Sequence, residues 1–109
     1  MKFIAINPLD IEKTNAVIIG AESAMNKSIS SCLSSLAYYE SIENKISSIV
    51  RSIIKNHHFK DGNKRTSFNA FEVLCFLNNR EVKQKDWNAI FWDLAESNYS
   101  VEQITEILF

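Results

Sequence analysis

The sequence predicts an all-α fold in a single domain that covers residues 1–109. Its two glycines and one proline leave few positions for tight turns. Apolar residues make up 46% of the chain and recur at helical spacing in several segments, whereas no segment has the clear alternation of a half-buried strand. These observations favour long helices packed around one modest core.

The first helix is expected to begin at Asn7 and Pro8 and to end at Gly20. Proline is favoured in the first turn of a helix and glycine just after its end, and Asp10 adds an acidic residue near the start. Residues 21–39 are rich in serine and small side chains and lack helical spacing. This segment is therefore the best candidate for a loop or a short hairpin.

The second helix begins after Ser41, a favoured capping residue, and carries the clearest apolar stripe of the chain. The apolar residues follow one another at steps of four, three, one, three and one, which places them on one face of an α-helix. They are Ile42, Ile46, Ile49, Val50, Ile53 and Ile54. A third helix, from Asn63 to Asn78, is apolar over much of its surface, and we expect it to be the central, buried one.

Two shorter helices are expected in the C-terminal third of the chain. One starts at Lys85 or Asp86, and a capping box of Ser100 and Gln103 starts the other. Their predicted inward faces are Trp87, Ile90, Phe91 and Leu94 for the one, and Val101, Ile104, Ile107 and Leu108 for the other.

Composition narrows the possible functions. A formal charge of −1 disfavours a general nucleic-acid-binding surface. No apolar run approaches the roughly 20 residues of a membrane span, and the apolar N-terminus stops at Asn7, too early for a signal peptide. Cys32 and Cys75 fit no metal spacing and are expected to be reduced. We therefore expect a cytoplasmic protein without nucleic-acid or membrane partners.

The run from His57 to Thr66 holds most of the functional information in the chain. The N-terminus of a helix leaves about four backbone N–H groups unpaired and carries a partial positive charge, and Gly62 lets an anion approach the backbone closely. Lys64 and Arg65 add full positive charges on the same turn, where they destabilise the helix unless an anion is bound. The pattern favours a bound phosphate.

Asp61 precedes the glycine and is placed to hold Mg²⁺ on that phosphate, since Mg²⁺ typically takes one or two carboxylates plus phosphate oxygens and water. His57 lies four residues earlier and, with an ordinary pKa of about 6.5, can accept a proton from an attacking hydroxyl at neutral pH. Phosphoryl and nucleotidyl transfer require positioning, charge neutralisation and a base. The run thus indicates a site for a magnesium-bound nucleoside triphosphate, with ATP as the expected one.

Each residue also has a simpler interpretation. Asn63 can be only a helix cap, Asp61 only a turn residue and Lys64 only a solvated charge. Zinc held by His57, His58 and Asp61 is disfavoured because the chain has two histidines and no thiolate near them. The ordered combination of these residues is a more specific signal for a phosphate site than any one of them alone.

The run resembles the signature of the Fic/Doc family, which reads H-x-F-x-[D/E]-G-N-x-R. The signature is met by His57, Phe59, Asp61, Gly62, Asn63 and Arg65. The similarity extends over roughly residues 32–80. It implies a compact helical fold with a small β-hairpin flap, and a transferase that modifies a serine, threonine or tyrosine hydroxyl of another protein with a nucleoside triphosphate.

The resemblance also implies a role for each matching residue. His57 resembles the general base that deprotonates the target hydroxyl, and Asp61 resembles the Mg²⁺ ligand. Gly62 and Asn63 resemble the anion nest around the phosphates. Arg65 resembles the cation that grips the phosphates and steadies the transition state.

The flap is expected around Ser31–Tyr39, within the segment that lacks helical spacing. In this family the flap docks the target segment in extended form, by strand addition. Leu33 and Leu36 are the flap residues expected to contact the target.

Two departures from the family pattern favour one reaction. The AMP-transferring branch usually has glycine after the Asn and a second arginine three residues after the first, where this chain has Lys64 and Phe68. Lys64 places a cation at a different position of the run, which is compatible with a nucleotide that lies in the opposite direction to that of the AMP-transferring branch. The run thus resembles the Doc branch, small toxins that transfer a γ-phosphate to a protein hydroxyl, with a translation elongation factor as the associated target. Doc-like kinase activity is therefore favoured over AMPylation.

The resemblance implies a partner as well. Many Fic proteins carry an inhibitory helix with the pattern [S/T]-x-x-x-E-[G/N], but Glu43, the one Glu followed by such a residue, has Tyr39 four residues before it. A separate antitoxin is therefore expected. Two alternatives stay open: a non-catalytic protein-binding module, which loss of His57 or Asp61 would have marked, and a nucleic-acid binder using the Lys55–Arg65 cluster.

Overall fold

The computed structural model of the chain describes residues 2–20, 33, 36–56 and 62–109. Within those residues all regular structure is helical, as predicted, and no strand is present. The elements in chain order are α1 (Pro8–Ile19), the short 3₁₀ helix η2 (Leu36–Tyr38), α2 (Ile42–Asn56), α3 (Asn63–Leu77), α4 (Trp87–Glu96) and α5 (Val101–Leu108).

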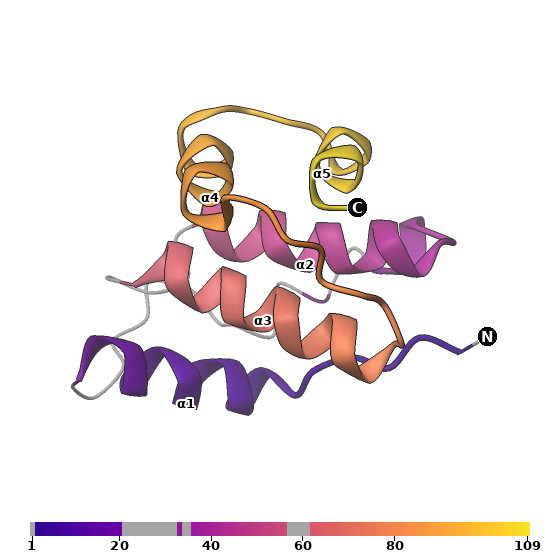
Figure 1. Cartoon of the computed structure of the whole chain (residues 1–109). Coiled ribbons are helices and arrows are strands. Elements are labelled where there is room, and N and C mark those ends of the chain that lie inside the picture. The colour runs from indigo at the N-terminus through magenta and orange to yellow at the C-terminus, as the bar shows by residue number, and fades with distance from the viewer. Residues whose placement is uncertain (1, 21–32, 34–35, 57–61) are drawn as a thin grey trace.

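Helices α2 and α3 form the centre of the molecule (Figure 1). α1 packs on α3, α5 packs on α2, and α4 contacts both central helices. The prediction that α3 alone would be central is therefore incomplete, because α2 contacts α3, α4 and α5. The N-terminal end of α3, where the functional run ends, lies near α4 and the end of α1 (Figure 1).

The apolar stripe predicted for α2 is buried along its whole length. Ile46, Ile49, Val50 and Ile53 each have an exposed fraction of 0%. Aromatic rings of α3 and α4 fill a second part of the core, where ring centroids lie 5.2–6.4 Å apart in tilted and edge-to-face arrangements. These rings belong to Phe68, Phe71, Trp87 and Phe91.

Helix ends predicted from capping residues are confirmed. α1 ends at Gly20, whose φ is +69°, and the hydroxyl of Ser41 accepts a hydrogen bond from the backbone N–H three residues later. α4 begins after Asp86, the second of the two predicted starts. Ser100 and Gln103 form both hydrogen bonds of the capping box before α5.

The segment before α1 is held by one buried amide at the end of α3. Asn78 Oδ1 accepts from the backbone N–H of Ile4 at 2.8 Å, and Asn78 Nδ2 donates to the carbonyl oxygens of Ile4 and Leu74 at 2.8 and 2.9 Å. The backbone of Ile4 therefore pairs with a side chain, and residues 3–6 form no strand.

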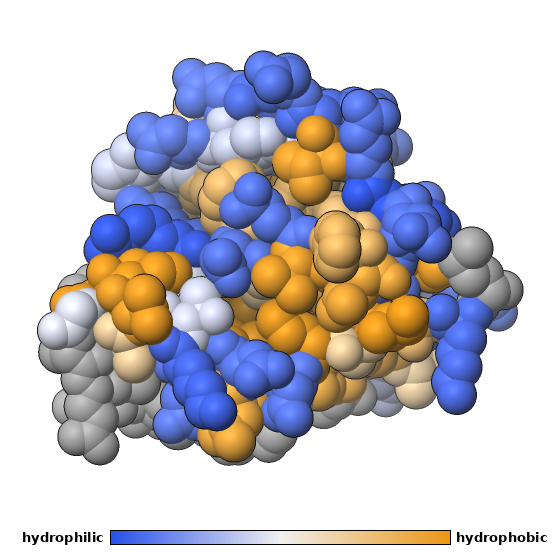
Figure 2. Space-filling view, turned by 60° about the horizontal axis from the view of Figure 1, so that its bottom comes forward, coloured by the Kyte–Doolittle hydropathy of each residue, from blue (hydrophilic) through white to orange (hydrophobic). Residues whose placement is uncertain are grey.

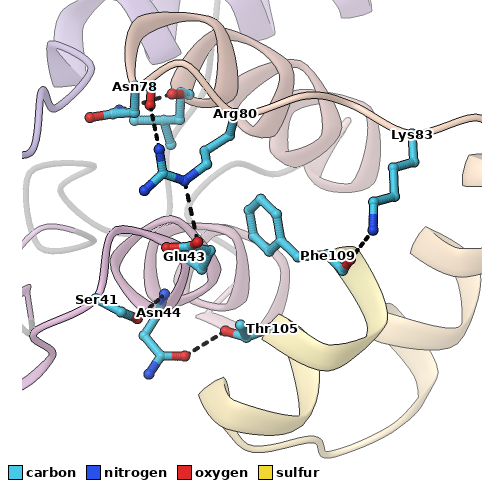
Figure 3. A network of polar contacts seen from close by, with 9 residues as sticks. Ser41, Glu43, Asn44, Asn78, Arg80, Lys83, Thr105 and Phe109 are labelled. Carbon is cyan, nitrogen blue, oxygen red and sulfur yellow. Dashed lines mark hydrogen bonds and ion pairs between the residues drawn. The ribbon is translucent and has the colours of Figure 1, made fainter.

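Polar contacts also join the connection between α3 and α4 to its neighbours (Figure 3). Arg80 forms an ion pair with Glu43 of α2, with 3.2 Å between Nε and Oε2, and donates a further hydrogen bond to the carbonyl oxygen of Asn78. The ammonium of Lys83 donates to the carbonyl oxygen of Phe109 at 2.7 Å. The connection from α3 to α4 is thereby fixed to both α2 and the C-terminus.

The predicted hairpin flap is not seen in the part of it that the structure describes. Leu36–Tyr38 form a 3₁₀ turn, in which the N–H of Tyr39 donates to the carbonyl oxygen of Leu36 at 3.2 Å. Lys45 Nζ donates to the same oxygen at 2.7 Å. Leu33 and Leu36 pack against the core, so their apolar side chains gain more from burial there than from a solvent-facing strand. The remaining flap positions lie outside the described residues.

Apolar and hydrophilic side chains both occur on the surface of the molecule. Figure 2 shows an apolar patch near the middle of the face that it presents, bordered by hydrophilic side chains. Across the described ranges, no helix has the length and apolar character needed to cross a bilayer.

Candidate active site

Gly62 forms the turn that starts α3. Its φ of +76° lies in the left-handed region, which glycine adopts without the steric cost that other residues incur. Its carbonyl oxygen accepts the first hydrogen bond of the helix, from the N–H of Thr66 at 2.9 Å. Gly62 is thus the capping position, and the alternative that Asn63 is only a cap is wrong, since Asn63 is the first helical residue.

The glycine turn lies directly against the end of α1. A β-carbon at Gly62 would lie 2.9 Å from Ile19 Cγ2 and 3.1 Å from Asn15 Nδ2, and both distances are shorter than ordinary contacts. Asn15 Nδ2 also donates to Thr66 Oγ1 at 3.1 Å, and both residues are fully buried. A buried hydrogen bond therefore joins α1 to the first turn of α3.

Sequence reasoning missed Asn15 and Thr66 as parts of the site. The signal was present in the spacing, because Asn15 lies four residues after the buried Ile11 and so shares the inward face of α1. A polar residue at a buried helical position needs a partner, which Thr66 supplies. Together they hold the phosphate-binding turn predicted from Gly62 in place.

The two predicted phosphate cations lie on the first turn of α3 and have different surroundings. Lys64 Nζ sits 3.4 Å from the centroid of the Trp92 ring, a cation–π contact with α4. Arg65 is exposed. Within the described residues, the first turn of α3 carries no acidic side chain, so these positive charges add to the positive end of the helix dipole.

The position where the AMP-transferring branch carries its second arginine is occupied by Phe68. Its ring lies 5.3 Å from that of Phe91 in an edge-to-face arrangement and 5.9 Å from that of Trp87. These contacts place the half-buried Phe68 ring in the aromatic cluster between α3 and α4. This position therefore supplies packing and no positive charge.

The remaining predicted site residues, His57 and Asp61, lie outside the described residues, as do His58 and Phe59. They immediately precede Gly62, which fixes where that segment joins α3. Among the described residues, no group of three or more His, Cys, Asp or Glu could hold a metal ion. The role of Asp61 as a Mg²⁺ ligand therefore stays a prediction, and a carboxylate is one of the donors that Mg²⁺ takes together with phosphate oxygens and water.

In the part of the chain that the structure describes, two titratable groups away from this turn have shifted pKa values. Burial raises the pKa of the Cys75 thiol to about 11. Such a thiol stays protonated at neutral pH, as befits a cysteine that is fully buried in the core. A hydrogen bond from the Tyr99 hydroxyl to Asp93 at 2.7 Å raises the pKa of Tyr99.

Glu43, the glutamate that comes nearest to the inhibitory pattern, has a structural role. The carboxylate of Glu43 pairs with Arg80 at 3.2 Å, which holds α2 against the start of the α3–α4 connection. This ion pair agrees with the sequence pattern, in which Tyr39 replaces the Ser or Thr expected before an inhibitory glutamate.

A comparison with known protein families shows which family the chain belongs to. The model of the Fic/DOC family matches residues 12–75, which is more than half of the sequence. The chain belongs to the Fic/DOC family. The match begins within α1, earlier than the roughly 32–80 that the motif suggested, and ends within α3. No curated protein is significantly similar to the chain.

Family membership carries a general function. Fic/DOC proteins are typically transferases that modify other proteins, and they generally use a nucleoside triphosphate with Mg²⁺ as co-substrate. The helical architecture is consistent with that fold. Helices α4 and α5 follow the matched region. The contacts of Phe68 and Lys64 with aromatic rings of α4 therefore join α3, which lies mostly within the match, to a helix outside it.

Proposed function

We propose that this protein transfers the γ-phosphate of a nucleoside triphosphate, ATP in the simplest case, to a serine, threonine or tyrosine hydroxyl of a target protein. The observation that carries this choice over AMP transfer is Phe68, which packs among aromatic rings where the AMP-transferring branch has an arginine. Without that cation, one end of the triphosphate lacks a clamp in the AMP-transferring orientation. Lys64, on the opposite side of Arg65 from Phe68 in the sequence, supplies a charge that this branch lacks.

The proposed roles follow from position and charge. Gly62 and Asn63 form the start of α3, where backbone N–H groups and the helix dipole favour phosphate oxygens. Lys64 and Arg65 neutralise negative charge on the same turn. Asp61 would hold Mg²⁺, which supplies further charge neutralisation on the triphosphate.

His57 is the proposed general base. It takes the proton of the target hydroxyl as the hydroxyl oxygen attacks the γ-phosphorus. The bond from the γ-phosphorus to the β-bridging oxygen breaks, and the nucleoside diphosphate leaves with that oxygen. The target gains a phosphate ester, so protons and charges balance with no oxidant or further reactant.

We further propose that the protein acts in the cytoplasm as the toxin of a toxin–antitoxin pair, with a translation factor as a candidate target. Support comes from the Doc-like run Asn63–Thr66 and from the pairing of Glu43 with Arg80, which leaves the one candidate inhibitory glutamate engaged in packing. Expression of the wild-type chain should stop growth, and expression of the His57→Ala variant should not. Growth arrest by the His57→Ala protein would instead favour the non-catalytic binding module.

Radiolabel transfer separates the two reactions. Purified protein, Mg²⁺ and a whole-cell lysate are incubated with γ-³²P-ATP or with α-³²P-ATP. We expect label on a lysate protein from the γ-labelled nucleotide alone, and a loss of roughly 10²–10⁴-fold in the His57→Ala variant because a positioned base is removed. Label from the α-labelled nucleotide would show AMP transfer and contradict the proposal.

A further inference from the structure

The ammonium of Lys64, on the first turn of α3, lies on an aromatic ring of α4. Its Nζ is 3.4 Å from the centroid of the Trp92 ring, and tryptophan is the aromatic residue that forms the strongest cation–π contacts. Trp92 has an exposed fraction of 52%, so this contact lies at the surface and not in the core. Two helices that are distant in the sequence therefore meet at one cation of the proposed phosphate site.

The ring attracts the ammonium without cancelling its charge. A carboxylate in the same place would neutralise Lys64 and repel a phosphate, whereas an indole ring carries no net charge and attracts a cation through its quadrupole. A lysine ammonium has three N–H donors, and a ring on one side of it leaves donors for phosphate oxygens on the other. The contact with Trp92 is thus compatible with an anion bound at the same turn.

The acidic neighbour of Trp92 is held by other partners. The carboxylate of Asp93 accepts hydrogen bonds from the hydroxyl of Tyr99 at 2.7 Å and from the hydroxyl of Ser97 at 3.0 Å. Lys64 forms no ion pair with any residue that the structure describes. Its described surroundings therefore fix the ammonium through a ring and leave its positive charge uncompensated.

A lysine that is already held in place binds an anion more tightly. A free lysine side chain loses rotamer freedom when it grips a ligand, and a side chain that rests on a ring has lost part of that freedom beforehand. We propose that Trp92 is a positioning residue, which holds the ammonium of Lys64 beside the start of α3 and so strengthens the binding of the triphosphate. The proposal rests on the proposed function for the identity of the ligand. Trp92 lies outside the region that matches the family model, so the motif alone does not predict this role.

Calorimetric titration with Mg²⁺–ATP of variants at position 92 tests the proposal. Trp92→Leu keeps an apolar side chain but removes the ring, and it should bind Mg²⁺–ATP roughly 2- to 5-fold more weakly than wild type, as loss of an exposed cation–π contact predicts. Trp92→Phe restores a ring face and should bind more tightly than Trp92→Leu. Trp92→Glu attracts Lys64 but cancels its charge, and it should bind more weakly than Trp92→Leu.

Phe76 provides the matched control. Its exposed fraction is 82% and it lies in the last turn of α3, at the other end of the helix from Lys64. Phe76→Leu makes the same kind of change as Trp92→Leu, from an exposed aromatic ring to leucine. It should bind Mg²⁺–ATP like the wild type.

A double-mutant cycle separates positioning from a merely structural role. Lys64→Met removes the ammonium that Trp92 holds, so Trp92→Leu should have no further effect on the affinity for Mg²⁺–ATP in that background. A loss of the same size in both backgrounds would show that Trp92 acts through packing alone, and it would overturn the proposal.

The outcomes also separate this proposal from the function on which it rests. If Trp92→Leu binds Mg²⁺–ATP as tightly as the wild type, the positioning role is overturned. Label transfer from γ-³²P-ATP by the wild type would then show that the proposed function stands. If the wild type neither binds Mg²⁺–ATP nor transfers label, the proposed function falls, and the role of Trp92 falls with it.

Discussion

At the scale of single residues, Gly62 combines a left-handed φ of +76° with a close approach to the end of α1. Gly20 provides a matched comparison, because its φ is +69° but nothing lies within 4 Å of the position of its missing β-carbon. The difference between the two glycines therefore isolates the effect of crowding from that of backbone conformation. That crowding involves Ile19 and Asn15 of α1, which lie against the turn at Gly62.

Replacing each glycine with alanine tests this difference. Gly20→Ala should lower the free energy of unfolding by about 1–2 kcal/mol, the cost of a left-handed conformation for an L-residue. Gly62→Ala should lower it by at least about 1 kcal/mol more, since Ile19 has to shift. Urea unfolding of both variants measures the difference. Equal losses would mean that α1 does not constrain the turn.

The thiol of Cys75 predicts a dependence of stability on alkaline pH. Its pKa is raised by burial from 9.0 to about 11, so the folded protein holds the proton where the unfolded chain releases it. The stabilisation is complete below pH 9 and is lost as the pH rises through 11. Between these values the wild type should lose roughly 2–3 kcal/mol more unfolding free energy than Cys75→Ala. Parallel pH profiles of the two proteins would contradict the burial of this thiol.

At the scale of helices, Asn78 connects the end of α3 to the segment before α1. Its side chain makes hydrogen bonds with both backbone groups of Ile4 and with the carbonyl oxygen of Leu74, and its exposed fraction is 2%. Asn79 follows with a φ of +56° and is exposed. Two adjacent asparagines therefore have different roles, one in tertiary contact and one in ending the helix.

Substitution separates these roles. Asn78→Ala should lower the free energy of unfolding by about 2–4 kcal/mol, because buried backbone groups of Ile4 lose their partners. Asn79→Gly should be neutral or more stabilising by up to about 1 kcal/mol, since glycine adopts a positive φ readily. Thermal or urea unfolding distinguishes them, and similar values for the two variants would mean that the N-terminal segment is not held by Asn78.

The helices could be predicted because their signals are local. Capping residues such as Ser41, Asp86 and Ser100 act within one turn, and the spacing of the isoleucines in α2 determines which face is buried. The flap could not be predicted in the same way. A hairpin was inferred from family resemblance, but Leu36 gains burial and an intramolecular partner in Lys45 from a 3₁₀ turn.

At the scale of the whole molecule, the site depends on contacts between helices that are distant in sequence. The motif identified Gly62 to Arg65 because these residues are adjacent in the sequence, and they lie within the region that matches the family model. The hydrogen bond between Asn15 and Thr66 and the contact of Lys64 with Trp92 arise from packing. Such contacts have no local sequence signal, so they required the three-dimensional arrangement.

Calorimetric titration with Mg²⁺–ATP measures whether the start of α3 binds a magnesium-bound triphosphate, as we propose. Arg65→Met removes an exposed cation of the site, and Lys2→Met removes an exposed charge next to the N-terminus, the end of the chain that Figure 1 shows far from the start of α3. We expect the Arg65→Met protein to bind roughly 10- to 150-fold more weakly than wild type, as loss of a hydrogen bond to a charged group predicts, and Lys2→Met to bind like wild type. Undiminished binding by Arg65→Met, or no binding by the wild type, would show that the start of α3 is not the triphosphate site.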